Sequence, residues 1–297
     1  MDRFQNIVVQ SSSGVKTITL NRPDKRNALT PALIEELSLA LSEAESCECG
    51  VVILTGAGPA FCAGMDIEHL EMGSPSAVRN DAENMANVLR TLYEFPKPVI
   101  AAVNGAAIAA GMSLATIPDF TLAAPEAKFG FNEVRVGFVP AIEASFLLRQ
   151  VGEKRTRELL LTGRLLKAQE ALHLGLVTHI VAAPELQQSA QALACGLLQN
   201  SPQAMQATKT LLAKHAQRRL DEEIEDAIAA NAEHLAKEDF IEGVRAFKQH
   251  RKADWPSVSC NSSVPAKFSS VTAAAKPTKD CSNSRANLAM TKGVLKF

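Results

Sequence analysis

The chain has 297 residues, of which 46% are hydrophobic, so it is long enough to bury a full core in one large domain or two small ones. Its formal net charge of −1 at pH 7 gives no reason to expect a nucleic acid or a membrane as a partner. The spacing of its six cysteines and six histidines fits no metal-ligand pattern, so we predict no metal and reduced, structural thiols.

The N-terminal part of the chain predicts a hairpin, a helix and a buried strand. It lacks the basic, apolar and cleavage regions of a secretory signal, so we expect a cytoplasmic location. Residues 4–10 and 15–20 alternate apolar and polar side chains and flank a Ser-Ser-Ser-Gly turn, which predicts an antiparallel hairpin. Residues 30–31, Thr-Pro, can cap and open a helix. The apolar run 51–55 predicts a buried strand.

The rest of the chain alternates strands with helices and then becomes helical. Helical spacing covers residues 76–95, and strands are predicted at the start of 99–115, at 119–124 and at 175–181. Pro140 opens one predicted helix, and a second opens at Glu153. From Pro184 to His250 nearly all of the pattern is helical. This order predicts an α/β fold closed by a helical region.

The composition changes after Pro256. Residues 257–297 are rich in Ser, Lys, Asn and Ala, lack helical periodicity, and contain six basic residues and one acid. We therefore expect a disordered basic tail.

Two predicted strands run into loops of small residues. The strand 51–55 continues into Gly56–Asp66, and the strand that begins at Val99 continues into a Gly- and Ala-rich series that could open a helix. Small side chains let another group approach the backbone, and a helix start presents unpaired N–H groups. Together the loops could aim two N–H groups at one point, as in an oxyanion hole. Tight packing of a core helix is the alternative; a membrane span is excluded because polar residues dilute the run.

Five segments, in this order, resemble the crotonase or enoyl-CoA hydratase/isomerase superfamily: NRPDKRNAL (21–29), AFCAGMDI (60–67), KPVIAAVNGAAIAAG (97–111), AKFGFNEVRVGFVP (127–140) and ALHLGLVTHIV (171–181). The resemblance implies a spiral of β-β-α turns followed by a helical trimerisation region, and hence a homotrimer or a dimer of trimers. On this basis we predict a crotonase spiral core over 1–200 and a C-terminal helical region over 201–256, with the basic tail beyond them.

The resemblance also implies an acyl-CoA thioester substrate, whose carbonyl would take on enolate charge between the backbone N–H groups of Met65 and Ala110. Glu133 matches the family's second glutamate and would act as acid or base. Coenzyme A would be part of the substrate, so we predict no separate cofactor. Lys25 and Arg26 could meet its phosphates, although a solvated turn explains them equally well. The other positions that we expect at the substrate site are Ala28, Ala63, Gly64, Asp66, Ile67, Gly111 and Ser113.

Ser113 departs from the family pattern. In two-glutamate hydratases this position, three residues after the second oxyanion donor, holds the first glutamate, and a serine at best orients a water. Glu143, near the start of the helix opened by Pro140, is a candidate for the missing carboxylate. An acid in a first helical turn can instead complement the helix dipole, which is the interpretation that the sequence favours.

Three functions stay open on the sequence. The first is an enoyl-CoA hydratase for a short or branched acyl group, because residues 119–181 look most like hydratases of the methylglutaconyl-CoA type from leucine degradation, several of which lack the first glutamate. The second is an enoyl-CoA isomerase that uses Glu133 as a single proton shuttle. The third is a non-catalytic acyl-CoA-binding protein, against which the two loops and Glu133 argue.

Overall fold

The computed structural model describes residues 3–72, 75–235 and 237–255, all within the first of two compact units, Met1–Ser259. The predicted tail 257–297 lies outside the described residues.

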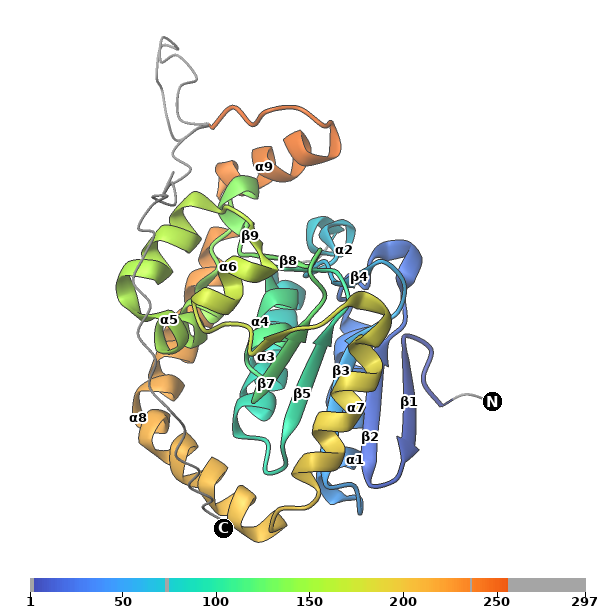
Figure 1. Cartoon of the computed structure of the whole chain (residues 1–297). Helices are drawn as coiled ribbons and strands as arrows, with labels where there is room; N and C mark the ends of the chain where they lie inside the picture. Colours follow the sequence, from blue (N-terminus) through green and yellow to red (C-terminus); the bar gives the residue numbers. More distant parts are fainter. Residues whose placement is uncertain (1–2, 73–74, 236, 256–297) are drawn as a thin grey trace, which may run out of the picture. The chain divides into compact units, whose positions relative to one another are not determined.

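A six-stranded sheet forms the centre of this unit (Figure 1). Its strands, in spatial order, are β1 (Ile7–Ser12), β2 (Val15–Leu20), β3 (Val51–Gly56), β5 (Val99–Val103), β7 (Phe120–Ala123) and β10 (His179–Ile180). The first two pair antiparallel in the predicted hairpin, with Ile7 opposite Leu20, and every later pair is parallel. The parallel strands therefore end at one common edge.

A second, smaller sheet lies beyond that edge, in the order β4 (Ala60–Cys62), β6 (Ala106–Ile108), β8 (Lys128–Gly130) and β9 (Leu166–Lys167). Each of β3, β5 and β7 is followed along the chain by one short strand of this sheet and then by helix. This repetition confirms the β-β-α spiral of a crotonase-type fold. The sequence did not predict β4 and β6, because strands of three residues are too short to show alternation.

The helices begin close to where the sequence signals them. Thr30 accepts a hydrogen bond from the backbone N–H of Leu33, as expected of an N-cap, and the helices predicted from Pro140 and from Glu153 meet at a kink, Gly152 (φ 74°). The helices are α1 (Pro31–Ser46), α2 (Ile67–Met72), α3 (Pro75–Glu94), α4 (Ala110–Thr116), α5 (Ala141–Thr162), α6 (Ala168–His173), α7 (Leu186–Leu197), α8 (Pro202–His234) and α9 (Glu238–Lys248), with 3-10 turns η1 (Pro23–Lys25), η2 (Glu133–Val136) and η3 (Ala183–Glu185).

Helices cover both faces of the central sheet. Figure 1 shows α7 lying across one face, where Leu186, Ala190 and Ala194 pack on apolar side chains of β3 and β5. The opposite face packs against the buried sides of α1, α3 and α4. Since β3 and β5 are buried on both faces, their positions are fixed, and so are the starts of the two loops that leave them.

The C-terminal helices pack on the spiral rather than on the central sheet. The long helix α8 contacts α3 and α5, and α9 contacts the turn η2. No helix in the described part of the chain is long and apolar enough to cross a membrane.

Candidate active site

The loop after β4 leaves one backbone donor without a partner. The N–H of Leu29 bonds to the carbonyl of Gly64 at 2.8 Å, and the N–H of Asp66 bonds to the carbonyl of Leu29 at 2.9 Å. These bonds fix the chain on both sides of Met65, whose own N–H makes no hydrogen bond within the described residues. An unpaired donor between two anchored peptides is suited to bind a ligand oxygen.

The loop after β6 leaves a second such donor. Ala109 has φ 53° and ψ −130°, a backbone conformation that costs a residue with a side chain roughly 1–3 kcal/mol. Hydrogen bonds hold it there, from Ala109 N–H to the carbonyl of Gly130 and from Met112 N–H to the carbonyl of Ala109, both at 2.8 Å. The N–H of the next residue, Ala110, opens α4 and has no acceptor in the described chain.

The two loops touch each other at glycines. A Cβ atom on Gly64, where φ is 88°, would lie 2.8 Å from the Cβ of Ala109 and 3.7 Å from the backbone nitrogen of Ala110. A Cβ on Gly111 would lie 2.3 Å from the carbonyl oxygen of Cys62. Side chains at either glycine would push the loops apart, so these glycines allow the donors of Met65 and Ala110 to converge.

Asn27 holds the first loop in place. Its side chain is fully buried, and its amide nitrogen lies 2.9, 2.9 and 3.1 Å from the carbonyl oxygens of Ala57, Ala60 and Phe61. Its amide oxygen accepts the backbone N–H of Arg22 at 2.9 Å. Asn27 belongs to the segment NRPDKRNAL, but no role was predicted for it. Its positive φ of 55° and these bonds identify it as a positioning residue.

Both unpaired donors border one cavity of about 130 Å³. Two acids line the same cavity: Glu133, from the turn η2, and Glu143, from the first turn of α5. The remaining lining residues are small or apolar apart from one amide; the full set is Ala63, Met65, Ile67, Ala109, Ala110, Asn132, Glu133, Val136, Phe138, Glu143, Phe240, Val244 and Phe247. The structure thus brings both candidate acids and both candidate N–H donors together.

The two carboxyl groups are buried and have few partners. Glu133 is 7% and Glu143 6% exposed. Both carboxyl oxygens of Glu133 and Oε2 of Glu143 lack a hydrogen bond to any described residue. Burial raises the pKa of Glu143 to about 7. Burial also raises the pKa of Glu133 well above its usual range, and the neighbouring charge of Glu143 raises it further.

The burial of Glu143 and its raised pKa argue against the helix-dipole interpretation of this residue. The residue does lie in a first helical turn, as the sequence predicts. However, an acid that only complements a dipole is normally solvated and ionised, whereas burial holds the pKa of this one near neutrality. Its place on the cavity wall therefore favours the catalytic alternative.

Ser113, by contrast, does not reach the cavity wall. It lies inside α4, is 1% exposed, and its hydroxyl oxygen has no hydrogen-bond partner among the described residues. Gly111 lies in the same helix, where the absence of a side chain allows α4 to pack closely against the backbone of Cys62.

The other expected substrate-binding residues lie at the cavity, at the contact between the loops, or around the turn η1. Ala63 and Ile67 line the cavity, and Gly64 lies at the contact between the loops. Lys25 and Arg26 are exposed at the turn η1, where Lys25 forms an ion pair with Glu68 at 3.5 Å. A hydrogen-bonded group ties this turn to the first loop, because Arg22 donates to the carbonyl of Ala28 and to Asp66.

Part of the cavity wall comes from α9, where the sequence favoured a core role for Phe247 over a contact with coenzyme A of a neighbouring subunit. Phe240, Val244 and Phe247 follow helical spacing on one side of α9, and the ring of Phe240 lies 5.6 Å from that of Phe138. The helix approaches η2 closely, since a Cβ on Gly243 would lie 2.3 Å from the carbonyl oxygen of Val136. The contact between α9 and η2 joins segments about a hundred residues apart, so the local sequence signalled it only through the apolar side of α9.

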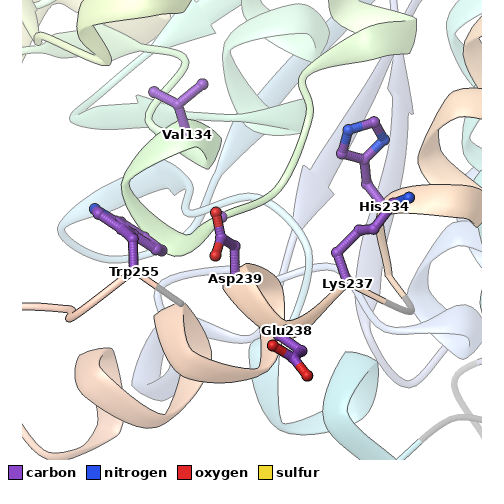
Figure 2. A pocket seen from close by; sticks show the side chains of 7 residues that line it. Val134, His234, Lys237, Glu238, Asp239 and Trp255 are labelled. Atoms are coloured by element: carbon purple, nitrogen blue, oxygen red, sulfur yellow. The ribbon is translucent and has the colours of Figure 1, made fainter. Parts of the chain in front are cut away.

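A larger cavity of about 590 Å³ borders Val134 of η2. Most of the side chains that line it are polar or charged. Figure 2 shows Asp239 and Trp255 on one side of it and His234 and Lys237 on the other. Lys237 forms an ion pair with Glu233 at 2.8 Å, and the cavity borders neither of the unpaired N–H groups nor the two buried acids. In the described chain, no cluster of three or more His, Cys, Asp or Glu residues could hold a metal ion.

Known proteins are similar to this chain over most of its length. A family model described as "Enoyl-CoA hydratase/isomerase" matches residues 10–258. A protein of Thermus thermophilus is 39% identical over 250 residues, which cover 82% of this chain and 98% of that protein. The 2,3-dehydroadipyl-CoA hydratase of Escherichia coli is 33% identical over 85% of this chain and 99% of its own. The crystal structure of an enoyl-CoA hydratase from Mycobacterium avium subsp. paratuberculosis superposes with a TM-score of 0.77 at 29% identity, covering 85% and 99% of the two chains.

Proposed function

This chain belongs to the enoyl-CoA hydratase/isomerase family, and from that membership we propose that it adds water across the double bond of a short 2-enoyl-CoA, with Glu133 and Glu143 as the catalytic pair. One observation carries the proposal: two buried carboxyl groups line the same cavity as two unpaired backbone N–H groups. Hydration needs both kinds of group at one place.

The N–H groups of Met65 and Ala110 bind the thioester carbonyl in this mechanism. As water adds to the β carbon, charge builds up on the carbonyl oxygen as an enolate. Fixed donors stabilise that developing charge, and each is worth roughly 3–4 kcal/mol of barrier in acyl chemistry. The anchoring bonds around Met65 and Ala109 mean that the donors need not reorganise during the reaction.

The two glutamates divide the proton transfers. Two buried carboxyl groups that interact cannot both ionise easily, so in the reactive form of this mechanism the pair holds one proton. Because the charge of Glu143 raises the pKa of Glu133, we assign the proton to Glu133 and the negative charge to Glu143. Glu143 takes a proton from the attacking water, and Glu133 gives its proton to the α carbon. In this mechanism Glu143 provides the second carboxylate, which Ser113 cannot provide.

The acyl group that we expect is short, either linear or branched, in keeping with the methylglutaconyl-type resemblance. Apolar side chains, among them Val136, Phe138 and Phe240, line the cavity beside the two acids and would enclose the hydrocarbon part of the acyl group. The exposed turn with Lys25 and Arg26 would lie toward the phosphates of coenzyme A. A homotrimer or dimer of trimers in the cytoplasm completes this proposal.

Isomerisation is the second candidate, and the position of Glu133 favours it. Moving a double bond from the 3- to the 2-position needs one carboxylate that removes and returns a proton beside the stabilised enolate. Glu133 alone could do so, with Glu143 serving only to raise its pKa.

Product analysis separates these functions. The full-length chain is incubated with crotonyl-CoA, a 3-enoyl-CoA and 3-methylglutaconyl-CoA, and the products are resolved by liquid chromatography and mass spectrometry. Hydration predicts a 3-hydroxyacyl-CoA from crotonyl-CoA, whereas an isomerase gives only 2-enoyl-CoA from the 3-enoyl substrate. Binding of all three without turnover would favour the non-catalytic function. Glu126→Gln, at an exposed glutamate, is the matched control for substitutions at the site.

A further inference from the structure

Two cysteines lie with their sulfur atoms almost in bonding contact at the end of α1. Cys47 is the residue that caps the helix, and Cys49 follows two positions later. Their sulfur atoms are 2.6 Å apart, well inside the packing distance of about 3.5–4.0 Å between carbon atoms. A disulfide bond is about 2.05 Å long, so a shift of about half an ångström would join them.

The surroundings shift the pKa values of the two thiols in opposite directions. Cys49 is buried, and its burial and the neighbouring Cys47 raise the pKa of its thiol to about 11. Burial also opposes ionisation of the half-buried Cys47. Hydrogen bonds from the thiol and the backbone N–H of Cys49, with the charges of Lys16 and Lys97, outweigh that effect and lower the pKa of Cys47.

Lys97 also offsets the partial negative charge at the C-terminal end of α1. The C-terminus of a helix carries partial negative charge, which disfavours a thiolate. The ammonium group of Lys97 donates to the carbonyl oxygens of Ala44 and Cys47 at 2.7 and 2.8 Å, so a positive charge lies at the last carbonyls of α1.

The pair is open to small molecules. A surface cavity of about 350 Å³ is lined by the turn 11–15, by both cysteines and by Glu48 between them. The other described cysteines lack this arrangement, because Cys62 is fully buried with its pKa raised to about 12 and Cys195 is exposed with no sulfur contact. The strand β3 begins at Val51, just after the pair, and reaches the active-site loops only at its far end.

We propose that Cys47 and Cys49 form a reversible dithiol–disulfide site, with Cys47 as the attacking thiol and Cys49 as the resolving thiol. The oxidant in this proposal is a hydroperoxide. The Cys47 thiolate attacks one peroxide oxygen, so that an S–O bond forms and the O–O bond breaks. The other oxygen takes a proton and leaves as an alcohol or as water. The Cys49 sulfur then attacks the Cys47 sulfenic acid, the S–S bond forms, and hydroxide leaves with the Cys49 proton as water. Two thiols lose two electrons and one peroxide gains them; a small dithiol reverses the change by exchange.

Mass spectrometry of the native full-length chain tests the pair. The reduced protein is treated with hydrogen peroxide, blocked with N-ethylmaleimide and cleaved after glutamate, which cuts at Glu48 between the two cysteines. We expect two peptides that stay joined, have lost two hydrogen atoms and separate after dithiothreitol. Independent overoxidation of the two cysteines, or peptides that are never joined, would overturn the proposal.

Single substitutions test the two roles. In Cys49→Ser, Cys47 should stop at the sulfenic acid and react with dimedone, whereas in Cys47→Ser, Cys49 should stay a thiol at the same peroxide concentration. Cys195→Ser is the matched control and should form the joined peptides as the unaltered chain does. If a variant fails to fold, timed alkylation of the unaltered chain decides instead: Cys47 should react well before Cys49, and equal rates would contradict the assigned roles.

Discussion

The two halves of the candidate site are built in opposite ways. The backbone half, around Met65 and Ala110, is held by hydrogen bonds, glycine contacts and the amide of Asn27. In the acid half, carboxyl oxygens of Glu133 and Glu143 have no hydrogen-bond partner among the described residues, and α9 supplies an apolar wall. Stabilising a developing charge requires fixed donors, whereas moving protons requires carboxyl groups whose pKa burial has brought toward neutrality.

The difference has a consequence for mutagenesis. Substitutions of the two glutamates in the acid half should lower catalytic activity while keeping the fold, because their carboxyl groups make few hydrogen bonds that stabilise the fold. Changes in the backbone half should affect turnover and stability together, since the same contacts position the donors and hold the loops.

Glu133→Gln should give the largest loss of activity. The amide keeps the shape of the side chain but cannot carry the proton, and general acid–base groups typically contribute about 10²–10⁴-fold. We expect kcat to fall within that range while the Kd for an acyl-CoA, measured by calorimetry, stays within about threefold. An unchanged kcat on the true substrate would show that Glu133 is not the proton donor; Glu126→Gln controls for loss of one surface charge.

Glu143→Gln should separate the two reactions. If Glu143 activates water, hydration of crotonyl-CoA falls by roughly 10²-fold or more, whereas isomerisation of a 3-enoyl-CoA through Glu133 survives better. Rates for both substrates are measured on one preparation. Equal, small effects on both reactions would return Glu143 to the role of a helix-start charge and leave Glu133 as the single carboxylate.

Gly64→Ala tests the backbone half. The added Cβ would lie 2.8 Å from the Cβ of Ala109, at a residue with φ 88°, so the loops must separate. We expect kcat to fall about 10–100-fold and unfolding free energy to fall by roughly 1–3 kcal/mol. Gly196→Ala is the matched control, because nothing lies within 4 Å of its added Cβ in α7 and alanine favours helix. Gly64→Ala with full activity would contradict the need for loop contact.

The same contrast separates what the sequence could predict from what it could not. The loops were predictable because glycine and alanine after an apolar strand are local signals, and the resemblance identified Met65, Ala110 and Glu133 as candidates. The burial of Glu143 on the cavity wall could not be predicted. Whether an acid in a first helical turn is solvated or buried depends on what packs around it, and here α9, about a hundred residues later, lines the same cavity. The bonds of Asn27 and the contact between Cys47 and Cys49 likewise depend on side-chain geometry that spacing does not reveal.

The last effect that we predict concerns stability alone, as a function of pH. The pKa of Glu143 is about 7 in the folded chain and about 4.3 for an unfolded glutamate, so between these values the folded state binds more protons. Its contribution to stability is therefore fully present below about pH 4 and is lost as the pH rises through about 7, by at most roughly 3–4 kcal/mol. Glu143→Gln removes this loss, so its Tm relative to the unaltered chain should be several degrees higher at pH 8 than at pH 5.5. The comparison between pH values cancels any constant cost of burying the amide. Glu126→Gln should show no such trend. A difference in Tm that does not change with pH would mean that Glu143 keeps one protonation state between pH 5.5 and 8, against a pKa near 7 in the folded chain.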